Sequence, residues 1–278
     1  MNIRIVTDSC VDHNKDVFGH EENMERVPFK IIIENEEMID KNIDLEELRE
    51  KMKATKNKIT TACPSPHEFL EAFKKCKENF VITISEKLSG SHNSAVLAAN
   101  MFKEEVEDAF VHIFDCKTAT AGASLVALKL KTMIEDKVEK HKIIEDINNY
   151  IDQMKTFLVP VKLDNLAKNG RISSKKAFVG SLLQVTPIMC DNGDGEIILK
   201  EQVRGRKKAF NRLLEIIGEE CENFEERILA ISHVNSEDRA LKLKEEILSR
   251  YNFKKVLIFE GGGLTTIYAD DGGLVVSY

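Results

Sequence analysis

The feature that most constrains the fold is a succession of apolar runs, small polar residues and helical patterns through the first half of the chain. Apolar runs at residues 3–7 (IRIVT), 80–85 (FVITIS) and 110–115 (FVHIFD) have the length and composition of buried strands. Strands that alternate with helices form parallel sheets, because each helix returns the chain to the start of the next strand. We therefore predict an α/β fold whose N-terminal domain, residues 1–157, contains a parallel sheet.

The segment between the first two strands predicts a short ribbon and two helices. Residues 26–39 are rich in strand-forming side chains, and residues 44–54 carry apolar residues at helical spacing. Ser65, Pro66 and Glu68 form the sequence pattern of a capping box with proline at the first helical position. A helix is therefore expected to begin at Pro66.

The pattern changes near residue 155 and predicts a C-terminal α+β domain, residues 158–278. Gly261–Gly263 follow an apolar run without an evident helical pattern, so we expect a turn there rather than a nucleotide-binding loop. The other segments are a strand at 157–163, a hairpin at 187–203 around residues 192–195, a strand at 227–234, a charged helix at 238–251, and strands at 254–260 and 273–278.

Composition excludes several classes of protein. The formal net charge is −7 and no basic run is dense, which argues against nucleic-acid binding. No apolar run approaches the roughly 20 residues of a transmembrane helix, and the N-terminus reads as a strand rather than a signal peptide. The six cysteines never form a C-x-x-C pair, so we expect reduced thiols and a cytoplasmic protein.

Small polar residues follow the predicted strands at four places: 7–10, 60–65, 89–91 and 115–118. Ligands of open parallel sheets gather at the carboxyl ends of the strands, where helix N-termini favour anions. Each group alone is also explained as a helix cap or a turn. Asp8, Ser9 and Asp115 are expected to fix loops by accepting or donating hydrogen bonds there.

Other kinds of site find little support. The chain lacks the glycine-rich signatures of phosphate loops, the nucleophile elbow G-x-S-x-G, and histidine pairs at metal-binding spacing. We expect no metal and no cofactor. Cys63 and Ser89 remain candidates for a nucleophile, with His67 and His92 nearby in sequence.

The basic and apolar residues that would complete a binding cleft lie in the second half. Arg171 and Arg204 are expected to face the serine and threonine loops across the cleft and to supply positive charge. An apolar helix containing Phe178, Leu182 and Leu183 would line the cavity behind them. Such a cleft suits an amphiphile with an anionic head, because burial of an alkyl chain contributes about 0.8 kcal/mol per methylene group.

As an ordered set, the motifs resemble the DegV family of bacterial fatty-acid-binding proteins, some of which serve as the acyl-carrying subunit of fatty acid kinase. The motifs are TDS at 7–9, T-x-x-P-S at 61–65, SGS at 89–91, DCK at 115–117, LDNLAKNGRIS at 163–173 and VRGRKKA at 203–209.

The resemblance implies a two-domain fold, with an N-terminal three-layer α/β/α domain around a parallel sheet and a C-terminal two-layer α+β domain with a mixed sheet. It implies one long-chain fatty acid, such as palmitate, stearate or oleate, buried between the domains. It implies that Thr61 and Ser89 bind the carboxylate. We add Ser91 to this carboxylate-binding group, as a turn or cap residue that helps to expose backbone N–H groups to the ligand. Arg171 and Arg204 would help to position the carboxylate for phosphorylation in members that work with an ATP-binding fatty acid kinase subunit.

Two departures from the family pattern bear on function. The usual T-S-Q-P reads Thr61-Ala62-Cys63-Pro64 here, and Thr266 falls near the position of a common C-terminal histidine. The leading hypothesis is a carrier that is not itself an enzyme. The alternatives are a subunit that presents the acyl chain to a kinase, and a stand-alone acyl hydrolase or transferase that uses Cys63 or Ser89.

Overall fold

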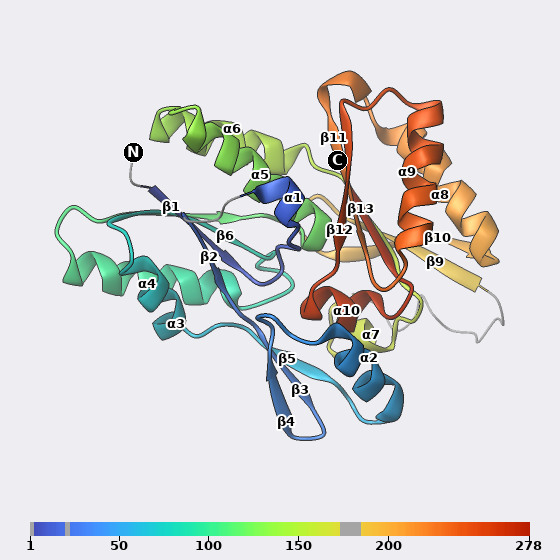
Figure 1. Cartoon of the computed structure of the whole chain (residues 1–278), viewed down its shortest axis with the longest axis horizontal. Coiled ribbons are helices and arrows are strands. Elements are labelled where there is room, and N and C mark those ends of the chain that lie inside the picture. The colour runs from blue at the N-terminus through green and yellow to red at the C-terminus, as the bar shows by residue number, and fades with distance from the viewer. Residues whose placement is uncertain (1–2, 20–22, 173–184) are drawn as a thin grey trace.

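The structure, a computed structural model, describes residues 3–19, 23–172 and 185–278. Two sheets lie side by side with helices packed around them, and a small ribbon projects from the N-terminal part (Figure 1). The α/β class, with one parallel and one mixed sheet, is as predicted.

The N-terminal sheet has four parallel strands in the order β2-β1-β6-β7. Alternation along β1 sends Ile5 and Val6 into different core clusters, one on each face of the sheet. Helices α3 and α4 share the cluster of Val6, and α5 and α6 share that of Ile5, which makes the three predicted layers. The bounds are β1 Ile3–Asp8, β2 Met24–Val27, β6 Glu78–Thr83, β7 Phe110–Asp115, α3 Pro66–Phe73, α4 Ser91–Glu105, α5 Thr120–Glu135 and α6 Lys140–Asp152.

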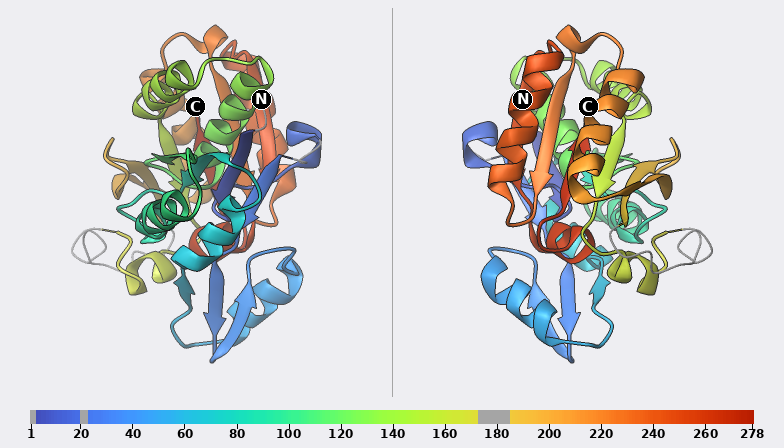
Figure 2. Two further views of the ribbon diagram at one scale, coloured as in Figure 1. Left: turned by 90° about the vertical axis from the view of Figure 1, so that its left-hand side faces the viewer. Right: turned by 90° about the vertical axis from the view of Figure 1, so that its right-hand side faces the viewer.

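The ribbon is a separate antiparallel sheet in the order β4-β3-β5. Its strands are β3 Lys30–Ile33, β4 Glu36–Ile39 and β5 Thr60–Ala62, and helix α2, Leu45–Ala54, packs on it. Figure 2 shows that this unit extends beyond the main sheets. The capping box of Ser65 and Glu68 forms as predicted and starts α3 directly after β5.

The C-terminal sheet has six strands in the order β10-β9-β8-β13-β11-β12, and only β11 and β12 are parallel among its described pairs. Helices α8 and α9 cover one face, and the other face lies against α5 of the N-terminal part. The bounds are β8 Thr156–Val159, β9 Val185–Asp191, β10 Ile197–Arg204, β11 Ile228–His233, β12 Lys255–Glu260, β13 Leu274–Ser277, α8 Arg206–Glu220 and α9 Glu237–Arg250.

The chain crosses from the N-terminal part to the C-terminal sheet in the short connection between α6 and β8. The predicted domain boundary at residues 157–158 therefore falls within β8. The predicted strand at 157–163 is shorter, ending at Val159 before Pro160, which has no N–H group for the ladder. A short helix, α7 Asp164–Lys168, follows. Two further short elements are α1 Lys15–Phe18 and a 3₁₀ turn at Phe224–Glu226.

The expectation of a simple turn at Gly261–Gly263 is wrong, because Gly263 begins helix α10, Gly263–Ala269. The N-terminus of α10 is bound by two aspartates distant in sequence. Asp12 accepts from the Gly262 N–H at 2.8 Å, and Asp40 accepts from the Gly263 and Leu264 N–H groups at 2.9 and 3.1 Å. Sequence pattern could not show this helix, because its capping groups come from other parts of the fold.

Candidate functional site

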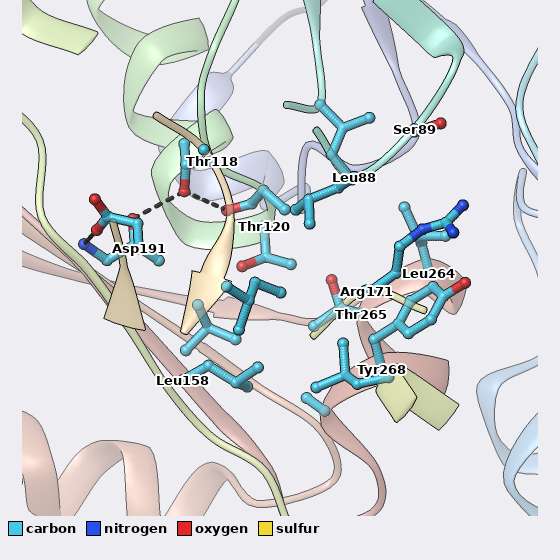
Figure 3. Close-up of a pocket in the computed structure, with 18 of the residues that line it drawn as sticks. Leu88, Ser89, Thr118, Thr120, Leu158, Arg171, Asp191, Leu264, Thr265 and Tyr268 are labelled. Carbon is cyan, nitrogen blue, oxygen red and sulfur yellow. Dashed lines mark hydrogen bonds between the residues drawn. The ribbon is translucent and has the colours of Figure 1, made fainter. Parts of the chain in front are cut away.

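A cavity of about 330 Å³ lies between the two sheets. Figure 3 shows Ser89, Arg171 and Tyr268 on one side of it, and Thr118 and Asp191 on the opposite side. Apolar side chains from both halves of the chain also line it: Leu88, Leu158, Leu166, Ile197, Leu264 and Val275. The cavity therefore has polar groups at two ends and an apolar interior.

The first end, which we call the hydroxyl end, contains Thr61, Ser89 and Tyr268. The Thr61 and Tyr268 hydroxyl oxygens are 2.8 Å apart. One of these two hydroxyl protons makes the bond within the pair, which leaves the other to donate to a ligand. Strand β5 carries Thr61 and helix α10 carries Tyr268, so the ribbon and the last helix together build this end.

Ser89 lies in the loop between β6 and α4. The Ser89 hydroxyl accepts from the Ser91 N–H at 3.2 Å, and its own O–H can donate to a ligand. Hydrogen bonds to Ser85 stabilise this loop, since the Ser85 carbonyl accepts from the Leu88 and Ser89 N–H groups at 3.0 and 3.1 Å. Ser89 is therefore presented at the cavity by an ordered turn.

Ser91 is placed differently from its predicted role. Its side chain is fully buried, it does not line the cavity, and its hydroxyl donates to Asp8 at 2.6 Å. Ser91 is therefore corrected from a candidate carboxylate ligand to a residue that anchors the start of α4 on Asp8.

Asp8, Ser9 and Asp115 are all engaged in the loops around the cavity. Asp8 also accepts from the Ile84 and Cys10 N–H groups at 2.9 and 3.2 Å; burial raises the pKa of the Asp8 carboxyl, and these hydrogen bonds oppose that rise. Asp115 accepts from the backbone N–H groups of residues 86 and 117 at 3.2 and 3.1 Å. Ser9 donates to Asp40 at 2.7 Å.

The two predicted arginines occupy different environments. Arg171 lines the cavity, and one of its guanidinium nitrogens donates to the Asn169 carbonyl at 2.6 Å. Arg204 is exposed at the end of β10 and does not line the cavity, so the expectation that it faces the hydroxyl-bearing loops is corrected. Phe178, Leu182 and Leu183, the predicted apolar wall, lie outside the described residues.

Helix α10 supplies site residues that the sequence did not indicate. Thr266, which sequence matching placed near the family histidine, is fully buried and does not line the cavity. The residue of this helix that reaches Thr61 is Tyr268. No local signal in the sequence marks Tyr268, because the groups that cap its helix, Asp12 and Asp40, are distant in sequence.

Burial dominates the electrostatics of these caps. It raises the pKa of the Asp12 carboxyl to about 6, against hydrogen bonds from Gly262 and from hydroxyl groups that lower it. Burial also raises the pKa of Asp40, while its hydrogen bond from Ser9 and the charge of Arg26 act in the opposite direction. Both carboxyl groups therefore cap the N-terminus of α10 while they are shielded from water.

The opposite end, which we call the hairpin end, is formed where the β9–β10 hairpin meets the loop after β7. The Thr118 and Thr156 hydroxyl oxygens are 2.8 Å apart, and Asp191 accepts from the Thr156 N–H at 2.7 Å. The polar groups of Thr118, Thr156 and Asp191 are thus hydrogen-bonded to one another.

Neither a metal centre nor a catalytic nucleophile is evident within the described ranges. They contain no group of three or more histidine, cysteine, aspartate or glutamate side chains that could hold a metal ion. Both candidate nucleophiles, Cys63 and Ser89, line the cavity. The histidine nearest to Ser89 in sequence is His92, and its Nδ1 atom lies 3.1 Å from the Thr83 hydroxyl oxygen. None of the described helices is long and apolar enough to cross a membrane.

Comparison with known proteins decides the family. The family model described as “Uncharacterised protein, DegV family” matches residues 2–278. The chain belongs to the DegV family. A DegV domain-containing protein of Streptococcus gordonii is 32% identical over 283 residues, which cover 100% of this chain and 99% of that protein.

Solved structures of DegV proteins share the whole fold. A DegV family protein from Ruminococcus gnavus, refined with vaccenic acid, has a TM-score of 0.94 at 32% identity, and each chain is covered completely. The Fatty Acid Kinase (Fak) B3 protein of Streptococcus pneumoniae, loaded with linoleic acid, has a TM-score of 0.92 at 29% identity over 100% of this chain and 99% of that one. The predicted two-part α/β architecture is thus that of the DegV family.

Proposed function

We propose that this protein binds one long-chain fatty acid, such as palmitate, stearate or oleate, between its two sheets. The observation that carries the proposal is the cavity with hydroxyl groups and Arg171 at one end and apolar walls behind them. Thr61, Ser89 and Tyr268 hold the carboxylate, and Leu158, Ile197 and Val275 surround the acyl chain. The relatives from R. gnavus and S. pneumoniae, which carry vaccenic and linoleic acid, support this assignment.

The geometry favours binding over catalysis. The Ser89 hydroxyl and one hydroxyl of the Thr61–Tyr268 pair can donate hydrogen bonds to a ligand, while the His92 ring contacts the Thr83 hydroxyl. A stand-alone hydrolase or transferase that uses Cys63 or Ser89 needs a base within reach of its nucleophile. We therefore propose a carrier of fatty acid rather than an enzyme, and we place it in the cytoplasm and without a cofactor.

The second candidate function is presentation of the acyl chain to an ATP-binding kinase subunit. Two observations favour it: the likeness to the Fak B3 protein, and the exposure of Arg204 on the surface. In this role Thr61, Ser89 and Tyr268 leave the carboxylate near the surface, since all three side chains are only partly buried. Arg204 contacts the partner.

Lipid extraction tests the first function directly. Protein purified from a bacterial host is expected to release close to one equivalent of fatty acid on extraction, detected by mass spectrometry. After delipidation, added palmitate or oleate is expected to raise the melting temperature, because a ligand that binds only the folded state stabilises it. Protein that carries no fatty acid and gains no thermal stability from either one would contradict the proposal.

The kinase role needs a separate assay. An ATP-binding fatty acid kinase subunit is expected to form acyl phosphate from fatty acid bound to this protein, and Arg204→Ala is expected to reduce turnover while fatty-acid affinity stays unchanged. Absence of turnover with the native protein would leave the carrier role alone.

A further inference from the structure

The hairpin end of the cavity is closed by the turn that joins β9 to β10. Gly195 and Glu196 of this turn line the cavity together with Thr118 and Asp191. In Figure 3 the latter two residues lie across the cavity from Ser89, Arg171 and Tyr268. The turn therefore stands where the cavity ends, opposite the hydroxyl end.

One buried contact fastens this turn to the N-terminal sheet. The Ser85 hydroxyl, which is fully buried, donates to the Gly195 carbonyl at 2.8 Å and accepts from the Lys87 N–H at 3.2 Å. Ser85 also begins the loop that carries Ser89, through the hydrogen bond from the Ser89 N–H to the Ser85 carbonyl. The contact thus joins the two halves of the molecule next to the acyl-chain space.

The contact leaves no room for a side chain at Gly195. A Cβ atom there would lie 2.2 Å from the Ser85 Oγ and 3.1 Å from both the Ser85 Cβ and the Lys117 Cα. Rotation of the Ser85 hydroxyl would relieve only the first of these overlaps, because the other two involve atoms that cannot rotate away. A side chain at Gly195 therefore displaces the Ser85 hydroxyl from the Gly195 carbonyl and also requires the turn to shift by a few tenths of an ångström away from Ser85 and Lys117.

Gly193, in the same turn, shows that backbone conformation alone does not explain this packing. Gly193 and Gly195 have nearly equal φ angles of +86° and +89°, both in the region that favours glycine. A Cβ atom at Gly193 would meet no atom within 4 Å. The two glycines are thus alike in conformation and differ in contact.

We propose that the contact between Ser85 and Gly195, the hairpin clasp, fixes the far wall of the cavity and sets the longest acyl chain that the protein binds. The inference rests on the proposed function, in which the carboxylate is held at Thr61, Ser89 and Tyr268. The methyl end of an extended chain then points toward the hairpin end. Each methylene group beyond the available length must displace a turn that is held by a buried hydrogen bond and by close packing.

Two variants and one matched control test the hairpin clasp. Gly195→Ala forces the turn away from Ser85 and Lys117, and Ser85→Ala removes the hydrogen bond without adding volume. Gly193→Ala places the same methyl group at the same kind of φ angle in the same turn, away from the clasp. Each delipidated protein is incubated with an equimolar series of saturated fatty acids from myristate to behenate, and the bound acids are quantified by mass spectrometry.

The native protein and Gly193→Ala are expected to show the same profile, with a sharp decline beyond one chain length. Gly195→Ala is expected to raise the bound ratio of arachidate to palmitate about tenfold, the effect of burying about two further methylene groups. Ser85→Ala is expected to raise the same ratio about threefold, as for the loss of one neutral hydrogen bond that holds the wall.

The inference is overturned if Ser85→Ala and folded Gly195→Ala keep the native profile, or if they lose affinity equally at every chain length, which would indicate a structural role only. Should Gly195→Ala fail to fold, Ser85→Ala decides alone, by the same two outcomes. A native protein that binds none of the acids overturns the proposed function, and the inference with it. The chain-length profile thus separates the two failures.

Discussion

The two ends of the cavity are built in different ways. The hydroxyl end combines a strand of the ribbon, the loop after β6 and helix α10, and its side chains are partly exposed. The hairpin end is closed by the β9–β10 turn, which is held on buried Ser85, and the nearby Thr118, Thr156 and Asp191 are hydrogen-bonded to one another. One end therefore offers hydrogen-bond donors to a ligand, and the other limits its length.

The difference also concerns what holds each end in place. The hydroxyl end depends on buried charge, since Asp12 and Asp40 hold α10 and thereby Tyr268. The hairpin end depends on a neutral hydrogen bond and on the absence of a side chain at Gly195. Changes in charge are therefore expected to act on the first end, and changes in volume on the second.

The largest expected effect is that of Asp40→Ala on the hydroxyl end. The substitution leaves the Gly263 and Leu264 N–H groups and the Ser9 hydroxyl without their acceptor, and each buried donor without a partner costs about 1–3 kcal/mol. We expect the free energy of unfolding to fall by about 3 kcal/mol or more, measured by urea denaturation. Fatty-acid binding is expected to weaken as well, because Tyr268 moves with the helix.

Asp44→Ala is the matched control for this substitution. Asp44 also caps a helix, accepting from the Glu46 and Glu47 N–H groups, but it is exposed at the start of α2. The loss of such a cap costs about 1 kcal/mol. Equal losses for Asp40→Ala and Asp44→Ala would show that the buried caps of α10 have no special importance.

The next effect is a pH dependence carried by Asp12. Its pKa is raised to about 6 by burial, so the folded state binds a proton that the unfolded state releases between pH values of about 4 and 6. The contribution of this group to stability is therefore fully present below about pH 4, and is lost as the pH rises through about 6. A shift of about two units corresponds to about 3 kcal/mol.

The measurement compares native protein with Asp12→Asn by chemical denaturation across this pH range. The stability of the native protein relative to the variant is expected to fall as the pH rises, because the amide has no charge to desolvate. A difference that is constant with pH would show that Asp12 does not titrate in this range.

The smallest effects concern individual hydroxyl groups at the hydroxyl end. Thr61→Ala, Ser89→Ala and Tyr268→Phe are each expected to weaken palmitate binding by about 0.5–1.5 kcal/mol, the range for a neutral hydrogen bond. Thr60→Ala is the control, since Thr60 is the neighbour of Thr61 on β5 and does not line the cavity. Calorimetric titration of delipidated protein gives the affinities, and unchanged binding in the Thr61→Ala/Tyr268→Phe double variant would remove the carboxylate from this end.

Local sequence patterns were sufficient to predict most of the fold. Apolar runs and the capping box of Ser65 and Glu68 depend on near neighbours, and they formed as expected. Helix α10 was missed because its caps, Asp12 and Asp40, lie more than 220 residues away in sequence. The strand at 157–163 was predicted too long because the break at Pro160 was not weighted.

Among the residues of the candidate site, those that follow strands were predicted, and those placed by tertiary contacts were not. Thr61 and Ser89 follow strands of the N-terminal part, and the cavity brings them together as expected. Tyr268 was missed because no local pattern joins it to Thr61. Ser91 and Arg204 were misplaced because the direction of a side chain next to a turn or a strand end depends on tertiary contacts, such as that of Ser91 with Asp8.

The orientation of the bound acyl chain is the most direct test of how the two ends divide their roles. A crystal structure of the delipidated protein loaded with palmitate brominated at its terminal carbon locates the methyl end by the anomalous signal of bromine. We predict bromine at the hairpin end, beside Thr118 and Gly195, with the carboxylate within hydrogen-bond distance of Thr61 and Tyr268. Bromine beside Tyr268, or a fatty acid bound outside the cavity, would contradict the assignment.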